Sequence, residues 1–179
     1  HNMSKSPAVF DIQKLRWMNG EYLKAMDSET FYAAAEPYLK KALTKDFDLH
    51  RIAEMVRTRI EVYPDIPEMV AFFEQVPEYD IALFTNKKAK TDAEKSLATL
   101  KDLLPRLEAS EDFTNDALFE MLKAYTQENG CKVNAVMWPL RIAVSGQSVT
   151  PAGATEIMDI IGKDESIARI RAAIEKLEA

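Results

Sequence analysis

Histidine and cysteine are almost absent from this sequence of 179 residues. It contains two histidines, His1 and His50, and one cysteine, Cys131. A Ser-His-Asp or Cys-His catalytic system therefore has almost no choice of base, and a zinc site needs more His and Cys ligands than the chain offers. A lone cysteine also excludes an internal disulfide, which favours a reducing compartment. We predict no catalytic residue, no metal ligand and a cytoplasmic location.

Glycine and long apolar runs are scarce as well. The five glycines stand singly, so neither a phosphate loop nor a dinucleotide-binding fingerprint can be assembled from them. No apolar run approaches the roughly 20 residues that cross a membrane. No charged segment followed by an apolar one, as in a signal peptide, is seen before residue 10. These absences predict no membrane partner and, with the missing histidines, argue against an independent enzyme.

The chain does contain strong helical periodicity. One apolar stripe starts at Leu49, after the predicted N-cap Asp48, and continues to Tyr63 before the stop at Pro64. Thr91 and Thr114 are predicted to cap two further helices. The predicted helices are 11–26, 29–43, 49–63, 66–76, 91–107, 114–129, 132–144, 153–161 and a last one after Gly162. The predicted fold class is all-α.

The periodicity is weakest between residues 77 and 90, where Asn86 and three lysines form a polar, basic connection. We place a boundary there and predict two packed helical subdomains, 1–85 and 86–179. Residues 1–3, His-Asn-Met, are interpreted as the remnant of an expression tag.

The formal net charge of −6 argues against a generic nucleic-acid binder, for DNA as for RNA, because such proteins usually carry a basic excess. The acidity is uneven: residues 1–90 hold 13 Lys and Arg against 14 Asp and Glu, whereas residues 91–179 hold 10 against 15. Phosphate contacts would therefore come mainly from the first half. Composition alone favours another alternative, an all-α adaptor that binds proteins and not RNA.

Two stretches are too particular to be explained by helix packing. The first reads SKSPAVFD at 4–11 and continues as KLRWMNGEY at 14–22; the second reads PLRIAVSG at 139–146, followed by TPAGATEI at 150–157 and IGK at 161–163. Both resemble the C-terminal, anticodon-binding region of bacterial glutamyl-tRNA synthetases, and the match extends over nearly the whole chain. The resemblance implies a cytoplasmic, monomeric α-helical cage that grips the anticodon stem and loop of glutamate tRNA during protein biosynthesis. In this cage, residues 1–85 would contact the stem and form the first anticodon-binding subdomain, and residues 86–179 would form the second.

The same resemblance implies that the catalytic domain is missing. The Ser-Lys-Ser at 4–6 is similar to the end of the family's lysine-rich ATP loop, but it runs directly into Pro-Ala-Val-Phe-Asp. The family's His-x-Gly-His signature cannot be formed with these histidines. The chain is therefore expected not to be an enzyme by itself and to need no cofactor. The full-length protein would be a class I aminoacyl-tRNA synthetase, a ligase that uses ATP and Mg²⁺.

Four anticodon-binding residues are implied by the resemblance. Arg59 falls in the first subdomain, and Arg141, Thr150 and Pro151 fall in the second. A helical wheel over 49–63 puts Arg59 beside Ile52, at the border of the apolar stripe. Pro151 is predicted to hold Thr150 extended and to begin the helix that follows. Without the resemblance, both arginines would be interpreted as solvated helix residues and Thr150 as a simple N-cap.

The proposed chemistry of Arg59 concerns the last anticodon base. Glutamate anticodons end in cytosine, whose N3 and O2 accept hydrogen bonds, whereas glutamine anticodons end in guanine, which presents the N1–H and N2–H donors. In a desolvated pocket, the N–H donors of a guanidinium would lie opposite the N–H donors of guanine and leave both unpaired. This costs about 1–3 kcal/mol or more of binding free energy. Arg59 therefore predicts a form that discriminates against glutamine tRNA.

Five other side chains are interpreted without a binding role. Trp17 and Trp138 are assigned to helix packing, because a tryptophan in an apolar stretch is more often core than a base-stacking surface. For Lys87, Lys88 and Lys90 contact with phosphates is one interpretation, and a solvated linker is the commoner one and is preferred here.

Overall fold

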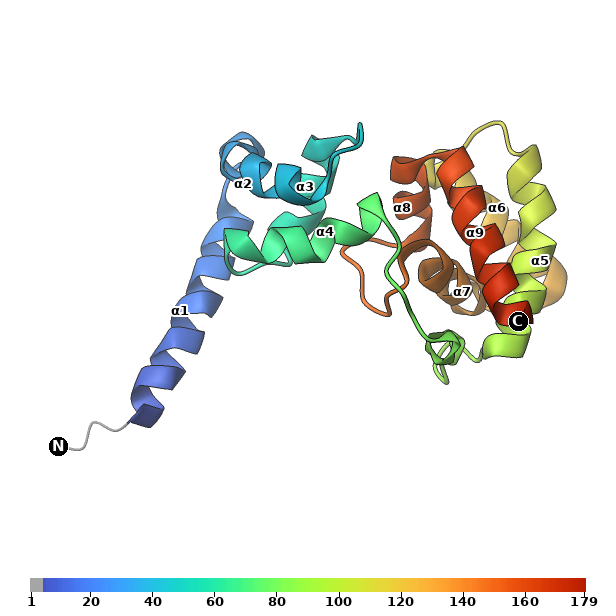
Figure 1. The fold of residues 1–179 in the computed structure, drawn as a ribbon, viewed down its shortest axis with the longest axis horizontal. Coiled ribbons are helices and arrows are strands. Elements are labelled where there is room, and N and C mark those ends of the chain that lie inside the picture. The colour runs from blue at the N-terminus through green and yellow to red at the C-terminus, as the bar shows by residue number, and fades with distance from the viewer. Residues whose placement is uncertain (1–4) are drawn as a thin grey trace. The chain divides into compact units, whose positions relative to one another are not determined.

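The structure is a computed structural model that describes the backbone of residues 5–179 and the side chains of residues 11–179. The expected tag remnant, residues 1–3, lies outside the described residues. Over the described range the chain forms nine α-helices and two short 3-10 helices without a β-strand, which confirms the all-α prediction (Figure 1). No helix in this range is long and apolar enough to cross a membrane.

Contacts within the chain divide it into two compact units, residues 1–74 and 75–179. The first contains α1 (Lys5–Ala25), α2 (Ser28–Ala42), α3 (Leu49–Arg57), the 3-10 helix η1 (Tyr63–Asp65) and α4 (Ile66–Glu74). The second contains the 3-10 helix η2 (Ile81–Phe84), α5 (Ala93–Ala109), α6 (Asn115–Asn129), α7 (Val133–Ser145), α8 (Ala154–Ile161) and α9 (Lys163–Glu178). Residues 75–85 join the second unit because η2 packs on α5 and α7. The functional assignment of 1–85 and 86–179 stays a prediction.

The core of the first unit lies between α2, α3 and α4. Its fully buried side chains include Phe31, Ile52 and the adjacent pair Phe72 and Phe73, whose ring centroids are 4.3 Å apart. Asp48 caps α3 by accepting the amide of Arg51, as predicted. The three helices thus form a small apolar centre that fixes the loops between them.

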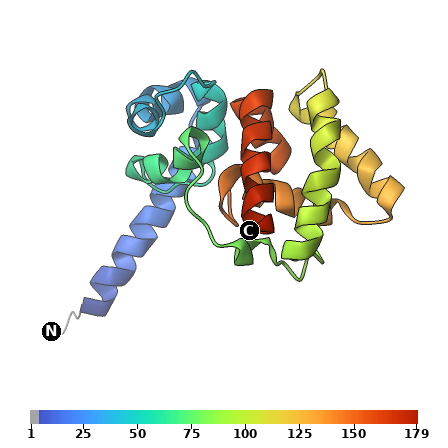
Figure 2. The same ribbon diagram turned by 45° about the vertical axis from the view of Figure 1, so that its right-hand side comes forward.

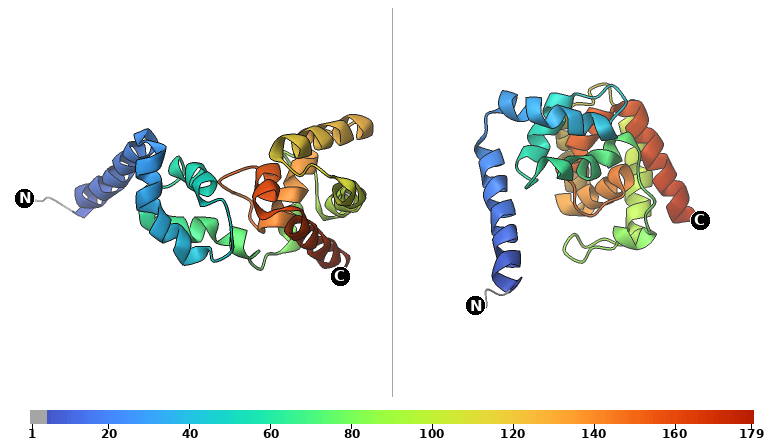
Figure 3. Two further views of the ribbon diagram at one scale, coloured as in Figure 1. Left: turned by 90° about the horizontal axis from the view of Figure 1, so that it is seen from above. Right: turned by 60° about the vertical axis from the view of Figure 1, so that its left-hand side comes forward.

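Helix α1 runs out from this core, and most of it stands clear of α2–α4 (Figures 1, 2 and 3). Among its described residues only Gly20 and Leu23 are buried. Trp17 is 60% exposed, so its assignment to packing within this chain is wrong. The last turns of α1 therefore attach the helix to the first unit.

In the second unit, α5 and α9 lie side by side (Figure 2). Helix α7 has the largest share of buried residues of any helix in this unit. Gly146 ends α7 with a φ of +66°, and a Cβ there would lie 3.1 Å from the carbonyl oxygen of Pro77. The buried Arg169 donates from its guanidinium to the carbonyl oxygen of Val144 at 2.6 Å, which satisfies one of the last carbonyls of α7. These contacts fix the C-terminal end of α7.

Candidate nucleic-acid interface

Arg59 lies in a turn after α3 and is exposed. The prediction of a helix through Tyr63 is wrong here, because α3 ends at Arg57 and Thr58 is its C-cap. The backbone amides of Glu61 and Val62 bond to the carboxylate of Asp65, at 3.2 and 3.3 Å, instead of continuing the helical ladder. Arg59 is therefore presented by a loop and not by a helix face.

The guanidinium of Arg59 makes no hydrogen bond or ion pair with any residue from 11 to 179. Its own amide donates to the carbonyl oxygen of Val56 at 2.8 Å, which anchors the backbone of the turn to α3. The donors of this side chain are thus available to an outside acceptor.

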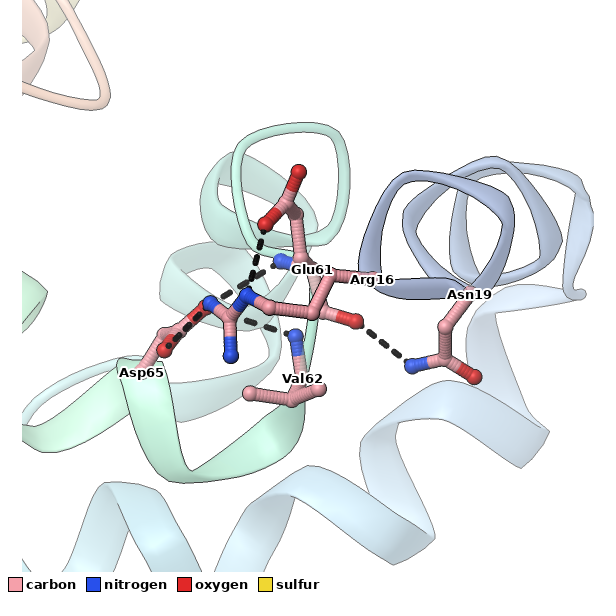
Figure 4. A network of polar contacts seen from close by, with 5 residues as sticks. All are labelled: Arg16, Asn19, Glu61, Val62 and Asp65. Atoms are coloured by element: carbon pink, nitrogen blue, oxygen red, sulfur yellow. Dashed lines mark hydrogen bonds and ion pairs between the residues drawn. The ribbon is translucent and has the colours of Figure 1, made fainter. Parts of the chain in front are cut away.

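A polar network ties α1 to the turn of Arg59 (Figure 4). The Nε of Arg16 donates to Glu61 at 2.9 Å, and its terminal nitrogen lies 3.2 Å from Asp65. The side-chain amide of Asn19 donates to the carbonyl oxygen of Glu61 at 2.5 Å. Hydrogen bonding to Glu61, supported by Asp65, raises the pKa of Arg16, so this guanidinium stays charged.

Arg141 lies within α7, which continues without interruption through Pro139. One terminal nitrogen of its guanidinium donates to the carbonyl oxygen of Ser148 at 3.1 Å, and the guanidinium carbon lies 5.9 Å from the ring centre of Trp138. The spacing of three residues puts both side chains on one face of the helix. Arg141 is therefore held between an aromatic ring and the loop after α7.

Trp138 and Arg141 open into a pocket of about 240 Å³ in the second unit. It is lined by Asn86, Lys88, Ala89, Asn134, Met137, Trp138, Arg141 and Ala154. The indole N–H of Trp138 donates to the carbonyl oxygen of Leu83 at 2.9 Å, so the ring is fixed and half-buried. One pocket thus combines an aromatic surface, two cations and two side-chain amides.

The interpretations of Trp138 as core and of Lys88 as a linker residue missed this pocket. The spacing of Trp138 and Arg141 on one helix could have predicted that their side chains share a face. The sequence does not predict that Asn86 and Lys88 approach the same place, because this depends on η2 and the following turn packing against α7.

Thr150 and Pro151 are both buried in the loop between α7 and α8. The Thr150 hydroxyl donates to the carbonyl oxygen of Ala152 at 2.6 Å. The prediction that Pro151 begins the next helix is wrong, since α8 starts at Ala154 with Gly153 as its N-cap. The structure brings this loop to the same end of α7 as Arg141, through the bond to Ser148. Arg59 belongs to the other unit.

Comparison with known proteins decides what kind of domain carries this pocket. The family model described as "Anticodon binding domain" matches residues 30–174. The chain belongs to this family. The pocket and all four predicted site residues lie within the matched range, whereas α1 precedes it.

Individual relatives give the same result. The chain is 54% identical over 178 residues to a glutamate–tRNA ligase from Lachnoclostridium phytofermentans and 50% identical to one from Clostridium acetobutylicum. Both alignments cover 99% of this chain but only 36% and 37% of the relatives, so the chain spans just over a third of their length.

Solved structures also match. A glutamate tRNA ligase from Elizabethkingia meningosepticum, crystallised in complex with its amino acid, superposes with a TM-score of 0.78 at 27% identity. That match covers 90% of this chain and 32% of the crystallised one. These matches confirm the resemblance to the anticodon-binding region of glutamyl-tRNA synthetases.

Proposed function

We propose that this chain binds tRNA at the anticodon stem and loop, and that its tRNA is glutamate tRNA. The observation that carries this function is the pocket of Trp138 and Arg141, located within an anticodon-binding domain. Relatives of high identity are glutamate–tRNA ligases, which supports the choice of tRNA.

The pocket suits an unpaired base of the anticodon loop. The indole ring of Trp138 offers a stacking surface, and base–aromatic stacking contributes about 1–3 kcal/mol per base. Arg141 and Lys88 provide donors for base acceptors or phosphates, and Asn134 offers a donor and an acceptor. Asn86 offers its amide donors, while its side-chain oxygen accepts the amide of Ala89 at 3.0 Å. Stacking with a few directed hydrogen bonds needs no basic surface over the whole protein, which is compatible with the net charge of −6.

In the second unit, Thr150 and Pro151 are buried and do not line the pocket; they belong to the loop whose Ser148 carbonyl oxygen accepts a hydrogen bond from Arg141. The Thr150 hydroxyl is already bonded to Ala152, so we assign the contact with the tRNA to the loop surface and not to this donor. In the first unit, Arg59 reads the last anticodon base, because its guanidinium is exposed and matches the acceptors of cytosine and not the donors of guanine.

We further infer that the full-length protein is an ATP-dependent glutamate–tRNA ligase that works as a cytoplasmic monomer, and that this chain alone does not aminoacylate. We assign ATP and Mg²⁺ to the rest of the full-length protein, because the glycines of this sequence stand singly and form no phosphate loop. The chain's own part is to bind and orient the tRNA.

Binding to two anticodon stem-loops across a salt series tests this function. One RNA carries the glutamate anticodon, and the other has guanine in place of the last cytosine. We expect binding that weakens as salt increases and favours cytosine. Binding that ignores the anticodon, or that does not change with salt, would contradict the function and support the adaptor alternative.

Two variants localise the binding. Arg141→Gln should weaken binding to both RNAs, because it removes a cation and donors from the pocket. Arg171→Gln is the matched control: it removes an equal charge from α9, where Arg171 pairs with Glu108 and lies outside the pocket. Equal losses in the two variants would show a bulk charge effect and place the binding elsewhere.

A further inference from the structure

The turn that carries Arg59 has little regular structure of its own. After α3 ends, the amides of Arg59 and Ile60 still donate to the carbonyl oxygen of Val56, at 2.8 and 3.1 Å. The amides of Glu61 and Val62 do not continue this ladder, so the conformation of the chain between Ile60 and η1 depends on side chains. The carboxylate of Asp65 accepts the amides of Glu61 and Val62, and it belongs to η1, which packs on α2 and α4. One end of the turn is therefore fixed to the core of the first unit.

The other support comes from α1. Asn19 binds the carbonyl oxygen of Glu61, and the position of Gly20 brings the backbones close: a Cβ there would lie 3.4 Å from the carbonyl oxygen of Ile60. Arg16 contacts the carboxylates of both Glu61 and Asp65. The positive charge of Arg16 offsets the repulsion between these two neighbouring carboxylates.

We propose that Arg16 is a positioning residue that holds the Arg59 turn through Glu61 and Asp65. This rests on the proposed role of Arg59 in reading the last anticodon base. The three-methylene stem of an arginine is flexible, so a turn without a fixed conformation would offer its donors in many directions, whereas base discrimination needs them in one. The contact also makes the setting of Arg59 depend on α1, which lies outside the matched domain.

The first measurement follows the turn itself, without RNA. In Arg16→Gln, amide hydrogen exchange should become faster at Glu61 and Val62 and stay unchanged in α7 and α9. The matched control is Arg106→Gln, which breaks an ion pair of similar exposure with Glu128 in the second unit. Unchanged exchange at Glu61 and Val62 would overturn the inference, whatever the tRNA result.

The second measurement separates positioning from general stability. The preference for a cytosine over a guanine stem-loop is measured for Arg16→Gln, Arg59→Gln and the double variant. We expect Arg16→Gln to reduce the preference about twofold or more, and to reduce it no further once Arg59 is replaced. Arg16→Lys should retain the preference for cytosine only in part, since an ammonium cannot span two carboxylates as a guanidinium does.

The outcomes distinguish the inference from the function on which it rests. If Arg59→Gln leaves the preference unchanged, the role of Arg59 is wrong and the inference fails with it. If Arg59→Gln removes the preference but Arg16→Gln does not change it, only the positioning role fails. Independent, additive losses in the double variant would also contradict it, because Arg16 would then act on the RNA by another route.

Discussion

The two units present their arginines in different ways. Arg141 projects from a buried helix whose end is fixed by Gly146 and Arg169, and it lies against the ring of Trp138. Arg59 projects from a turn that is bonded to the end of α3 and is held further by ion pairs of Arg16 with Glu61, in the turn, and Asp65, in η1. In a helix, the regular backbone fixes the position of a side chain, whereas in this turn contacts of neighbouring side chains contribute to it. The second unit should therefore tolerate surface changes that disturb the first.

The largest expected effect is on the end of α7 in the second unit. Gly146→Ala places a Cβ 3.0 Å from the side chain of Val76 in a left-handed conformation, so it should cost about 2–5 kcal/mol of unfolding free energy. Gly130→Ala is the control, because its φ of +62° is similar but nothing lies within 4 Å, and it should cost about 1–2 kcal/mol. Urea denaturation measures both. Equal losses would mean that the close approach of Val76 does not matter.

The next effect concerns the stacking surface of the pocket. Trp138→Ala should weaken binding of the glutamate anticodon stem-loop by about 1–3 kcal/mol, roughly five- to 150-fold, through lost stacking. Trp17→Ala is the matched control, since Trp17 is exposed on α1, outside the pocket. Calorimetric titration of the two variants measures the difference. A similar loss for Trp17→Ala would remove the special role of the pocket.

A smaller effect is expected for base selection in the first unit. Arg59→Gln should lower the preference for cytosine over guanine by about 1 kcal/mol or more, since a carboxamide can offer an acceptor to the guanine donors. Its melting temperature should stay unchanged, because Arg59 is exposed and its guanidinium has no partner among residues 11–179. Competition between the two stem-loops gives the ratio. A preserved ratio contradicts the assignment.

The smallest effect is a pH dependence in the first unit. Hydrogen bonds from the Thr44 hydroxyl and amide lower the pKa of Glu74. This group therefore adds stability that is complete above its ordinary pKa and is lost as pH falls through the lower, folded value. Glu74→Gln should flatten the fall in melting temperature between roughly pH 5 and pH 3. An unchanged slope would show that Glu74 adds nothing to folding.

Much of this fold can be predicted from local patterns. Asp48 and Thr114 cap their helices as expected, and Gly130 ends α6 with a positive φ. Thr91 was predicted as a cap, but Asp92 caps α5 instead while the Thr91 hydroxyl lies 3.2 Å from Ser96 in a buried contact. Such errors of one residue arise because neighbouring polar side chains compete for the same amides.

The site was harder to predict than the fold. Ile60 is buried as its apolar spacing suggests, yet the helix has ended there, and the carboxylate of Asp65 takes up the next free amides, those of Glu61 and Val62. The pocket depends on residues 86–89 packing beside α7, which no periodicity encodes. The resemblance supplied Arg59 and Arg141, and only the folded chain shows that Trp138 lies beside one of them.

The indole N–H signals test the central claim most directly, because the chain has two tryptophans and only one lines the pocket. In NMR spectra of the nitrogen-15-labelled protein, titration with the glutamate anticodon stem-loop should shift or broaden the indole signal of Trp138 and leave that of Trp17 in place. A fully paired duplex with the sequence of the same stem, which has no unpaired anticodon bases, should shift neither signal. A Trp138 signal that stays unmoved while the RNA binds would contradict the anticodon site proposed for this pocket.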